Sequence, residues 1–274
     1  MTIDNPMNTI FYSFDIEDYF MANCFDYQLK RSKWLSLESK IEYSFQILLD
    51  LLDEKNIKAT LFFLGFIGKH HPKLVKIAHS KGHEIASHGY HHELVYNLSP
   101  NQFDEDIKKS TNILEDLIGE KILGYRAPSF SLDINDLRYT DVLEKYGIKY
   151  DSSVFPNRFK SRTKINTKKS FFISDNLMEI PLSSEKLFGI NFPLGGAYFR
   201  LYPKGLNRLL FKRHLEKNNL IYYLHPWELL DSHPFYPKNQ YLKFKHTHNI
   251  GNNCKRKFLS IKEFNTGLMR EFLS

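Results

Sequence analysis

Short apolar runs alternate with amphipathic stretches along roughly the first 150 residues of the chain. The runs have the length of strands and end in polar residues; they lie at residues 9–15, 57–64, 83–87, 123–126 and 148–151. Between them, apolar residues recur at helical spacing over residues 36–55, 72–81, 99–118 and 135–146. This regular alternation predicts parallel strands joined by helical crossovers.

The alternation breaks over residues 156–200, where prolines and glycines predict loops with short strands near residues 177–180 and 197–201. It resumes with a helix at 203–217 and a strand at 220–224, and a last helix is expected over 260–273. Without a fixed-period repeat or a low-complexity linker, the pattern predicts a single domain over 1–274, with a basic C-terminal extension at about 236–274. We predict an α/β fold, a distorted or incomplete (β/α) barrel, with an open doubly wound sheet as the alternative.

Composition excludes several classes of protein. Hydrophobic residues make up 42% of the chain and charged residues 25%, which excludes a chain that is mainly disordered. Only Cys24 and Cys254 are present, so the fold does not depend on a disulfide framework. No signal peptide is recognised, and no apolar run approaches the ~20 residues that span a bilayer. We therefore expect a cytoplasmic protein, with the inner face of the membrane as a second location.

The net charge of +7 is concentrated near the C-terminus. From residue 236 onward there are eight Lys or Arg against two Glu. No helix-turn-helix, zinc-finger or RNA-binding signature accompanies this charge, so no nucleic-acid partner is expected. The excess indicates a solvated surface or a loop that faces an anionic substrate. Peripheral contact with a membrane through this basic tail is a further hypothesis.

Reactive side chains follow several of the predicted strands. In α/β barrels and open sheets the site lies at the carboxyl ends of the strands, where such side chains converge. Carboxylates follow the first strand, histidines follow the third and the late strand, and an arginine ends the fourth. These residues are Asp15, Glu17, Asp18, His88, His92, Arg126 and His225.

The histidines and acids together indicate a metal site. His88 and His92 are four residues apart, which places them on the same side of one helical turn. Neutral imidazole binds zinc and other divalent ions, and a carboxylate can complete the set. A second acid could then take a proton from metal-bound water. The alternative is that the histidines lie on a surface loop and that the acids are solvated.

Two further residues are open to two interpretations. Arg126, close before Pro128, could hold a carboxylate through two hydrogen bonds, or it could be a surface arginine. His225 follows a buried strand, so it is either a general acid or a core histidine whose hydrogen bonds are satisfied.

Four segments in this order resemble the polysaccharide deacetylase family, the NodB-homology or carbohydrate esterase family 4 group. They read SFDIED, HGYHH, RAPSF and LHPWE, and the resemblance covers residues from about 10 to 230. FDIEDYF together with HPWE is especially similar to the subgroup associated with bacterial exopolysaccharide and surface-glycan clusters. The resemblance implies a distorted (β/α) barrel of the NodB type and a divalent metal, commonly Zn²⁺.

The resemblance also implies an activity, the hydrolysis of an N-acetyl group, or sometimes an O-acetyl group, on an amino sugar. Transferred motif by motif, Asp15 is expected to be the general base and His225 the acid that protonates the leaving amine. His88 and His92 are expected to bind the metal. The substrate would be a polysaccharide, or a lipid-linked or nucleotide-linked glycan precursor.

Supporting roles follow from the same resemblance. Arg126 is expected to orient Asp15, Leu224 to line the acetyl pocket, and the backbone N–H of Ser129 to help stabilise the oxyanion. Tyr90 and Trp227 are candidates for stacking on sugar rings, although each could equally be a packing residue.

The chain departs from the family pattern in two places. The family's first motif has adjacent aspartates, whereas Ile16 follows Asp15 here, so the third metal ligand is either Glu17 or Asp18. Strand alternation favours Glu17 slightly, because it lies on the same side as Asp15. Asp151 could support His225, but its surrounding YDSS matches the family loosely. The alternative to an enzyme is a non-catalytic glycan-binding protein that retains the fold.

Overall fold

One curved sheet organises the molecule. The structure is a computed structural model that describes residues 8–23, 29–155, 167–234 and 237–274. The strands of the sheet follow the order β10-β1-β2-β3-β4-β5-β7-β6, and β11 also pairs with β1. They are β1 (Thr9–Ile16), β2 (Thr60–Phe63), β3 (Glu84–Ser87), β4 (Gly124–Tyr125), β5 (Tyr150–Asp151), β6 (Phe171–Phe172), β7 (Met178–Glu179), β10 (Leu220–Leu224) and β11 (Asn265–Gly267).

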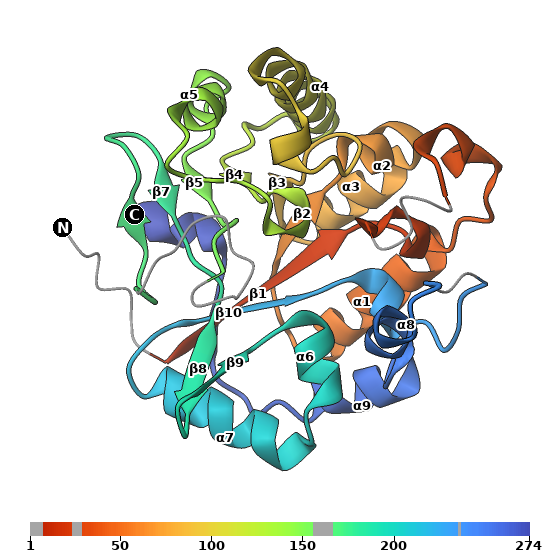
Figure 1. Ribbon diagram of the computed structural model, residues 1–274, viewed down its shortest axis with the longest axis vertical. Coiled ribbons are helices and arrows are strands. Elements are labelled where there is room, and N and C mark those ends of the chain that lie inside the picture. The colour runs from red at the N-terminus through yellow and green to blue at the C-terminus, as the bar shows by residue number, and fades with distance from the viewer. Residues whose placement is uncertain (1–7, 24–28, 156–166, 235–236) are drawn as a thin grey trace.

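All neighbouring strands of this sheet run parallel except β6 and β7, which are antiparallel. Helices lie around the outside of the curved sheet, and α8 lies beside the carboxyl end of β10 (Figure 1). They are α1 (Ile41–Glu54), α2 (Gly65–His70), α3 (Pro72–Ser80), α4 (Pro100–Ile118), α5 (Leu137–Lys145), α6 (Gly196–Leu201), α7 (Lys204–Leu215), α8 (Gln240–Thr247) and α9 (Asn252–Leu259). A separate hairpin joins β8 (Ser184–Leu187) to β9 (Ile190–Pro193). The architecture confirms the predicted distorted, incomplete barrel.

Burial on both faces explains why the strands read as continuous apolar runs in the sequence. All eight residues of β1 are buried. Ile10, Tyr12 and Phe14 face the main core, whereas Phe11 faces a second cluster on the inner side of the sheet. The same alternation turns Asp15 toward the inner side, at the carboxyl end of the strand.

The long helix α4 shows how local sequence sets element boundaries. The hydroxyl of Ser99 accepts a hydrogen bond from the backbone N–H of Gln102, whose side chain accepts one from the Ser99 N–H. Pro100 occupies the first turn, and Gly119 ends the helix in the left-handed region at φ 73°. A capping pair of this kind stabilises a helix by about 1 kcal/mol. The helix predicted at 99–118 is therefore confirmed.

Two predicted elements are wrong. The strand expected near 197–201 is helix α6, a short apolar stretch of the kind whose period does not separate strand from helix. The helix expected over 260–273 is strand β11 followed by a 3₁₀ helix, Met269–Leu273. Pairing with β1 and burial of Met269 and Phe272 decide the conformation there, and neither is visible in local sequence.

The basic C-terminal stretch, of which the structure describes residues 237–274, contributes α8, α9 and β11. Because β11 extends the sheet from β1, this stretch is joined to the barrel by backbone pairing. Among the described helices, none combines the length and the apolar character that crossing a bilayer requires.

Candidate metal and acid–base site

A cavity of about 310 Å³ lies at the carboxyl ends of the central parallel strands. Its lining includes Asp15 and Glu17 from the end of β1, His88 and His92 from the loop after β3, and His225 from the end of β10. The structure therefore brings together residues that are up to 210 positions apart in sequence, as parallel strands with a common carboxyl edge require. Helix α8 supplies part of one wall.

Glu17, His88 and His92 form a compact group of potential metal ligands. One ligand atom from each lies within 4.8 Å of the others, and all three side chains are buried. Nε2 of His92 is 2.7 Å from Oε2 of Glu17. The backbone of His92 is left-handed, at φ 55°. This conformation is strained for a residue that has a Cβ, and such strained residues concentrate at functional sites.

The hydrogen bonds behind the two imidazoles fix which nitrogen is free. Nδ1 of His88 is 2.7 Å from the carbonyl oxygen of Arg126, and Nδ1 of His92 is 3.2 Å from Oδ1 of Asn23. Both partners are acceptors, since the amide nitrogen of Asn23 donates elsewhere, to the hydroxyl of Ser129. Each Nδ1 is therefore the donor in its contact, which leaves each Nε2 as the atom that could bind a metal.

The two Nε2 atoms converge on the carboxylate of Glu17, which is the arrangement that a cation requires. Nε2 of His88 is buried without a hydrogen-bond partner among the described residues. Oε2 of Glu17 is likewise buried without a hydrogen-bond partner among the described residues, and Nε2 of His92 lies 2.7 Å from it. Two imidazoles and one carboxylate suit Zn²⁺ with positions left open for water. The residues present thus fit a divalent metal.

Titration behaviour agrees with ligand chemistry. Burial lowers the pKa of His88 to about 4, so its imidazole is neutral at physiological pH. Burial pushes the pKa of Glu17 upward, but the nearby His92 and His225 outweigh it and hold that pKa well below its usual range. Neutral imidazole beside an ionised carboxylate is the form that binds a metal.

Arg126 makes the predicted contact with Asp15. Its Nη1 donates to Oδ1 of Asp15 at 2.8 Å, and both side chains are buried. The remaining guanidinium donors bond the carbonyl and the hydroxyl of Ser152, each at 3.1 Å. The ring of Phe62 lies 4.1 Å from the guanidinium carbon. Arg126 is thereby fixed, and it holds one oxygen of Asp15 while the other, Oδ2, lies 3.8 Å from Nε2 of His225.

His225 is supported by a buried ion-pair chain that the sequence analysis missed. Its Nδ1 lies 2.7 Å from Oε1 of Glu228, and Oε2 of Glu228 accepts from Nε of Arg200. The other Arg200 donors bond the backbone carbonyls of His248 and Lys245. This chain of ion pairs leaves Nε2 of His225 directed toward the carboxylates of Asp15 and Glu17, at the end of β1.

The surroundings of His225 favour the protonated ring. Burial alone would lower its pKa, but the negative charges of Glu17, Glu228 and Asp15 together raise it to about 9. An imidazolium held by Glu228 can donate a proton from Nε2, which is what a general acid must do. One signal for Glu228 was in the sequence, because Glu three residues after His225 has the spacing of a capping box.

Asp18 and Asp151 have other partners. Asp18 accepts hydrogen bonds from the N–H of Tyr19 and from both the hydroxyl of Ser39 and the N–H of Lys40, so it caps two helix starts. Of the two alternatives for a third ligand, only Glu17 lies with the histidines. Asp151 bonds Ser153, whose hydroxyl in turn accepts from the N–H of Ala127, so it does not support His225.

Of the residues expected to contact substrate, Ser129 and Trp227 line the cavity, whereas Leu224 and Tyr90 do not. Ser129 lines the cavity, and its φ of 53° places it at a sharp turn after Arg126. Trp227 also lines the cavity, but it is 4% exposed and its ring stacks with the rings of His225 and His246, whose centroids are 5.2 and 4.1 Å away. Its indole N–H donates to Oε1 of Glu17 at 3.1 Å. Trp227 therefore positions the carboxylate of Glu17 and is not available to stack on a sugar.

Leu224 and Tyr90 do not line this cavity. Leu224 is fully buried in the main core at the end of β10, and its neighbour Tyr223 reaches the cavity instead. Tyr90 is 3% exposed, and the amine of Lys109 lies 3.8 Å above its ring. The sugar-stacking role expected of Tyr90 therefore has no geometric support.

Comparison with known proteins agrees with the motifs. Residues 28–151 match the family model described as polysaccharide deacetylase, and residues 152–274 match a domain of unknown function, DUF3473. The chain is 34% identical over 114 residues to a peptidoglycan deacetylase of Helicobacter pylori, covering 41% of this chain and 37% of that protein. A peptidoglycan deacetylase-like protein of Gibberella zeae is 35% identical over 109 residues, 39% of this chain and 31% of the relative. The chain thus spans about a third of the length of these curated relatives.

Solved structures share the fold at lower identity. A putative polysaccharide deacetylase from Mycobacterium smegmatis is 19% identical, with a TM-score of 0.60 over 82% of this chain and 80% of that one. A carbohydrate esterase family 4 pseudoenzyme from Bacillus anthracis is 11% identical, with a TM-score of 0.53 over 99% of this chain and 67% of that one. A structure described as a putative deacetylase and one described as a pseudoenzyme share this fold, so the fold alone does not decide whether this chain is catalytic.

Proposed function

Because residues 28–151 match the polysaccharide deacetylase family model, we propose that the chain is a metal-dependent hydrolase that removes an N-acetyl group from an amino sugar. The observation that carries the proposal is the convergence of Glu17, His88 and His92, with Asp15 and His225 on either flank. A metal ligand set, a base and an acid are the parts that amide hydrolysis by metal-activated water needs.

Bound Zn²⁺ would supply an acidified water and polarise the substrate carbonyl. Asp15 accepts the proton of the attacking water at Oδ2, because Arg126 occupies its other oxygen. The N–H of Ser129, which lines the cavity at a sharp turn, would donate to the developing oxyanion. His225 then delivers a proton from Nε2 to the departing amine, while Glu228 stabilises the ring in its charged form.

The proposal is tested by following acetate release from N-acetylglucosamine oligomers. We expect release to stop after chelation with EDTA and to return when zinc is added. His225→Ala is the matched control, because it should bind zinc as the natural protein does and yet release acetate far more slowly. Acetate release that survives complete removal of the metal would overturn the proposal.

The alternative is a glycan-binding protein that has lost the chemistry. Such a protein should lack the base, the acid or a ligand, and here Asp15, His225 and all three candidate ligands are present. Binding of the oligomers without acetate release from the zinc-loaded protein would favour this alternative.

Zinc as the metal, an exopolysaccharide or another surface glycan as the substrate, and the cytoplasm as the location are finer parts of the same proposal. A peripheral membrane contact through the basic tail is also proposed. Its exposed candidate is Arg256, with Lys255 half-buried beside it. Lys257 is not available, because its amine donates to the carbonyls of Arg200 and Tyr202. Unchanged association with anionic liposomes after charge removal at Lys255 and Arg256 would count against this contact.

A further inference from the structure

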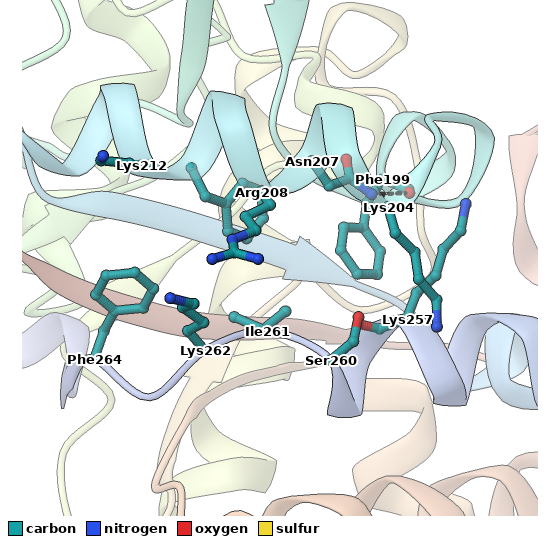
Figure 2. Close-up of a pocket in the computed structure, with 11 residues that line it drawn as sticks. Phe199, Lys204, Asn207, Arg208, Lys212, Lys257, Ser260, Ile261, Lys262 and Phe264 are labelled. Atoms are coloured by element: carbon teal, nitrogen blue, oxygen red, sulfur yellow. Dashed lines mark hydrogen bonds between the residues drawn. The ribbon is translucent and has the colours of Figure 1, made fainter.

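A second cavity, here called the basic pocket, lies between α7 and the chain that follows α9. It has a volume of about 300 Å³ and shares no lining residue with the candidate active site. Figure 2 shows α7 along one wall and residues 257–264 along the other, with Arg208 and Lys262 directed into the space between them. The basic pocket is therefore a separate site on the outer, helix-covered side of the sheet.

The walls of the basic pocket carry positive charge without compensation. Lys or Arg provides five of its eleven lining residues, and Asp or Glu provides none. Lys204, Arg208 and Lys212 recur every four residues, so they form one row along α7 over slightly more than two helical turns, about 12 Å. None of these three, nor Lys262 opposite, forms an ion pair with another described residue. Like charges four residues apart repel, so an anion on this row would be stabilising.

Lys257, the fifth cation of the lining, has a structural role. The amine of Lys257 donates to the backbone carbonyls of Arg200 and Tyr202, at the carboxyl end of α6. Lys257 is 9% exposed, so it fastens α9 to α6 and shapes the end of the pocket. Four cations, Lys204, Arg208, Lys212 and Lys262, are exposed and available to a ligand.

The floor of the basic pocket is apolar. Phe199, Phe211 and Ile261 are buried beneath it, and Phe264 is half-buried at one end. A free inorganic anion would leave this floor in contact with water, whereas a purely apolar ligand would leave the cation row unpaired. A ligand with an anionic group and an apolar group satisfies both surfaces.

We propose that the basic pocket binds a phosphorylated amphiphile, with its phosphate or diphosphate on the row formed by Lys204, Arg208 and Lys212 and its apolar portion on the aromatic floor. The guanidinium of Arg208 suits two phosphate oxygens, and the lysines add point charges on either side. A row of three cations suits the several negative charges of a diphosphate better than the single charge of a carboxylate. The proposal is independent of the deacetylase chemistry, because the two sites share no residue.

Calorimetric titration with three probes tests the proposal: farnesyl diphosphate below its micellar concentration, farnesol, and inorganic pyrophosphate. We expect farnesyl diphosphate to bind at least tenfold more tightly than either half alone. Pyrophosphate binding as tightly as farnesyl diphosphate would overturn the proposal and indicate a site for free phosphates. Farnesol binding as tightly would overturn it in favour of a purely apolar ligand.

Matched charge reversals locate the site. Arg208→Glu with Lys212→Glu changes two positions four residues apart in the pocket, and Arg213→Glu with Lys217→Glu changes two exposed positions with the same spacing outside it. We expect the first pair to weaken farnesyl diphosphate binding at least tenfold and the second to change it less than twofold. Equal effects of the two pairs would overturn the proposal. Lys262→Glu, on the opposite wall, serves as a single-site test should the first pair fail to fold.

Discussion

The two halves of the chain contribute different chemistry to the same cavity. The half before residue 156 supplies Glu17, His88 and His92, together with Asp15. The half after residue 166 supplies His225 and the Glu228–Arg200 pair behind it. In the proposed mechanism the first half would hold the metal and supply the base, and the second would supply the acid. Substitutions in the two halves should accordingly have separable effects on metal content and on turnover.

The largest effect is expected at the metal ligands. Glu17→Gln or His88→Ala should abolish metal content and acetate release together, because each removes a donor from the only cluster of its kind among the described residues. The loss of metal affinity should exceed the ~10–100-fold that substitution of an outer-shell partner causes. Metal content is measured by elemental analysis of the dialysed protein, alongside acetate release.

Asp18→Asn is the matched control for Glu17→Gln. Both oxygens of Asp18 accept hydrogen bonds and an amide keeps only one acceptor, so we expect the metal to be retained and the free energy of unfolding to fall by about 0.5–1.5 kcal/mol. Loss of metal from Asp18→Asn, with retention by Glu17→Gln, would reverse the assignment of the third ligand.

Replacing the base should separate turnover from metal binding. Asp15→Asn removes the proton acceptor but leaves the three candidate ligands, so acetate release should fall by ~10²–10⁴-fold with the metal retained. Activity close to that of the natural protein would remove Asp15 from the mechanism.

The second half is tested through the pH profile. His225 acts as an acid only when protonated, so activity should persist below its pKa and be lost as the pH rises through it. That pKa is about 9 without metal, where Glu17, Glu228 and Asp15 outweigh the effect of burial. A cation at Glu17 offsets part of this charge, so the alkaline limb of the zinc enzyme should lie below 9.

Glu228→Gln should move this alkaline limb to lower pH, by about one unit, which corresponds to ~1.4 kcal/mol. Metal content should not change, because Glu228 is not in the ligand cluster. The substitution also leaves Arg200 without its carboxylate, so the free energy of unfolding should fall as well. An unchanged pH profile in a folded Glu228→Gln protein would contradict the assignment of His225 as the acid.

The smallest effect is expected at a contact between the two halves, the hydrogen bond from Trp227 to Glu17. Trp227→Phe removes the indole N–H that donates to Glu17 but keeps an aromatic ring to stack with His225 and His246. We expect metal affinity to fall by about tenfold, toward the low end of outer-shell effects, with turnover of the loaded protein little changed. A competition titration with a zinc chelator measures the affinity, and a large loss of turnover at full zinc occupancy would assign Trp227 a different role.

The same division governs what could be predicted from sequence. In the first half, hydrophobic pattern and strand-end position were sufficient to predict β1, α4 and the grouping of His88 with His92. In the second half, the partners of His225 depend on tertiary packing. Arg200 lies on a segment whose short apolar pattern fits strand or helix, and α8 reaches the cavity only through the path of the tail. The choice between Glu17 and Asp18 as the third ligand also could not be made from sequence, because only the hydrogen bonds of Asp18 show that its side chain points elsewhere.

X-ray absorption at the zinc edge of the loaded protein tests the central claim most directly. Two imidazole nitrogens and one carboxylate oxygen should appear at about 2.0–2.2 Å, and Asp18→Asn should leave this environment unchanged. A zinc environment without histidine scattering, or one that Asp18→Asn alters, would contradict the proposed site.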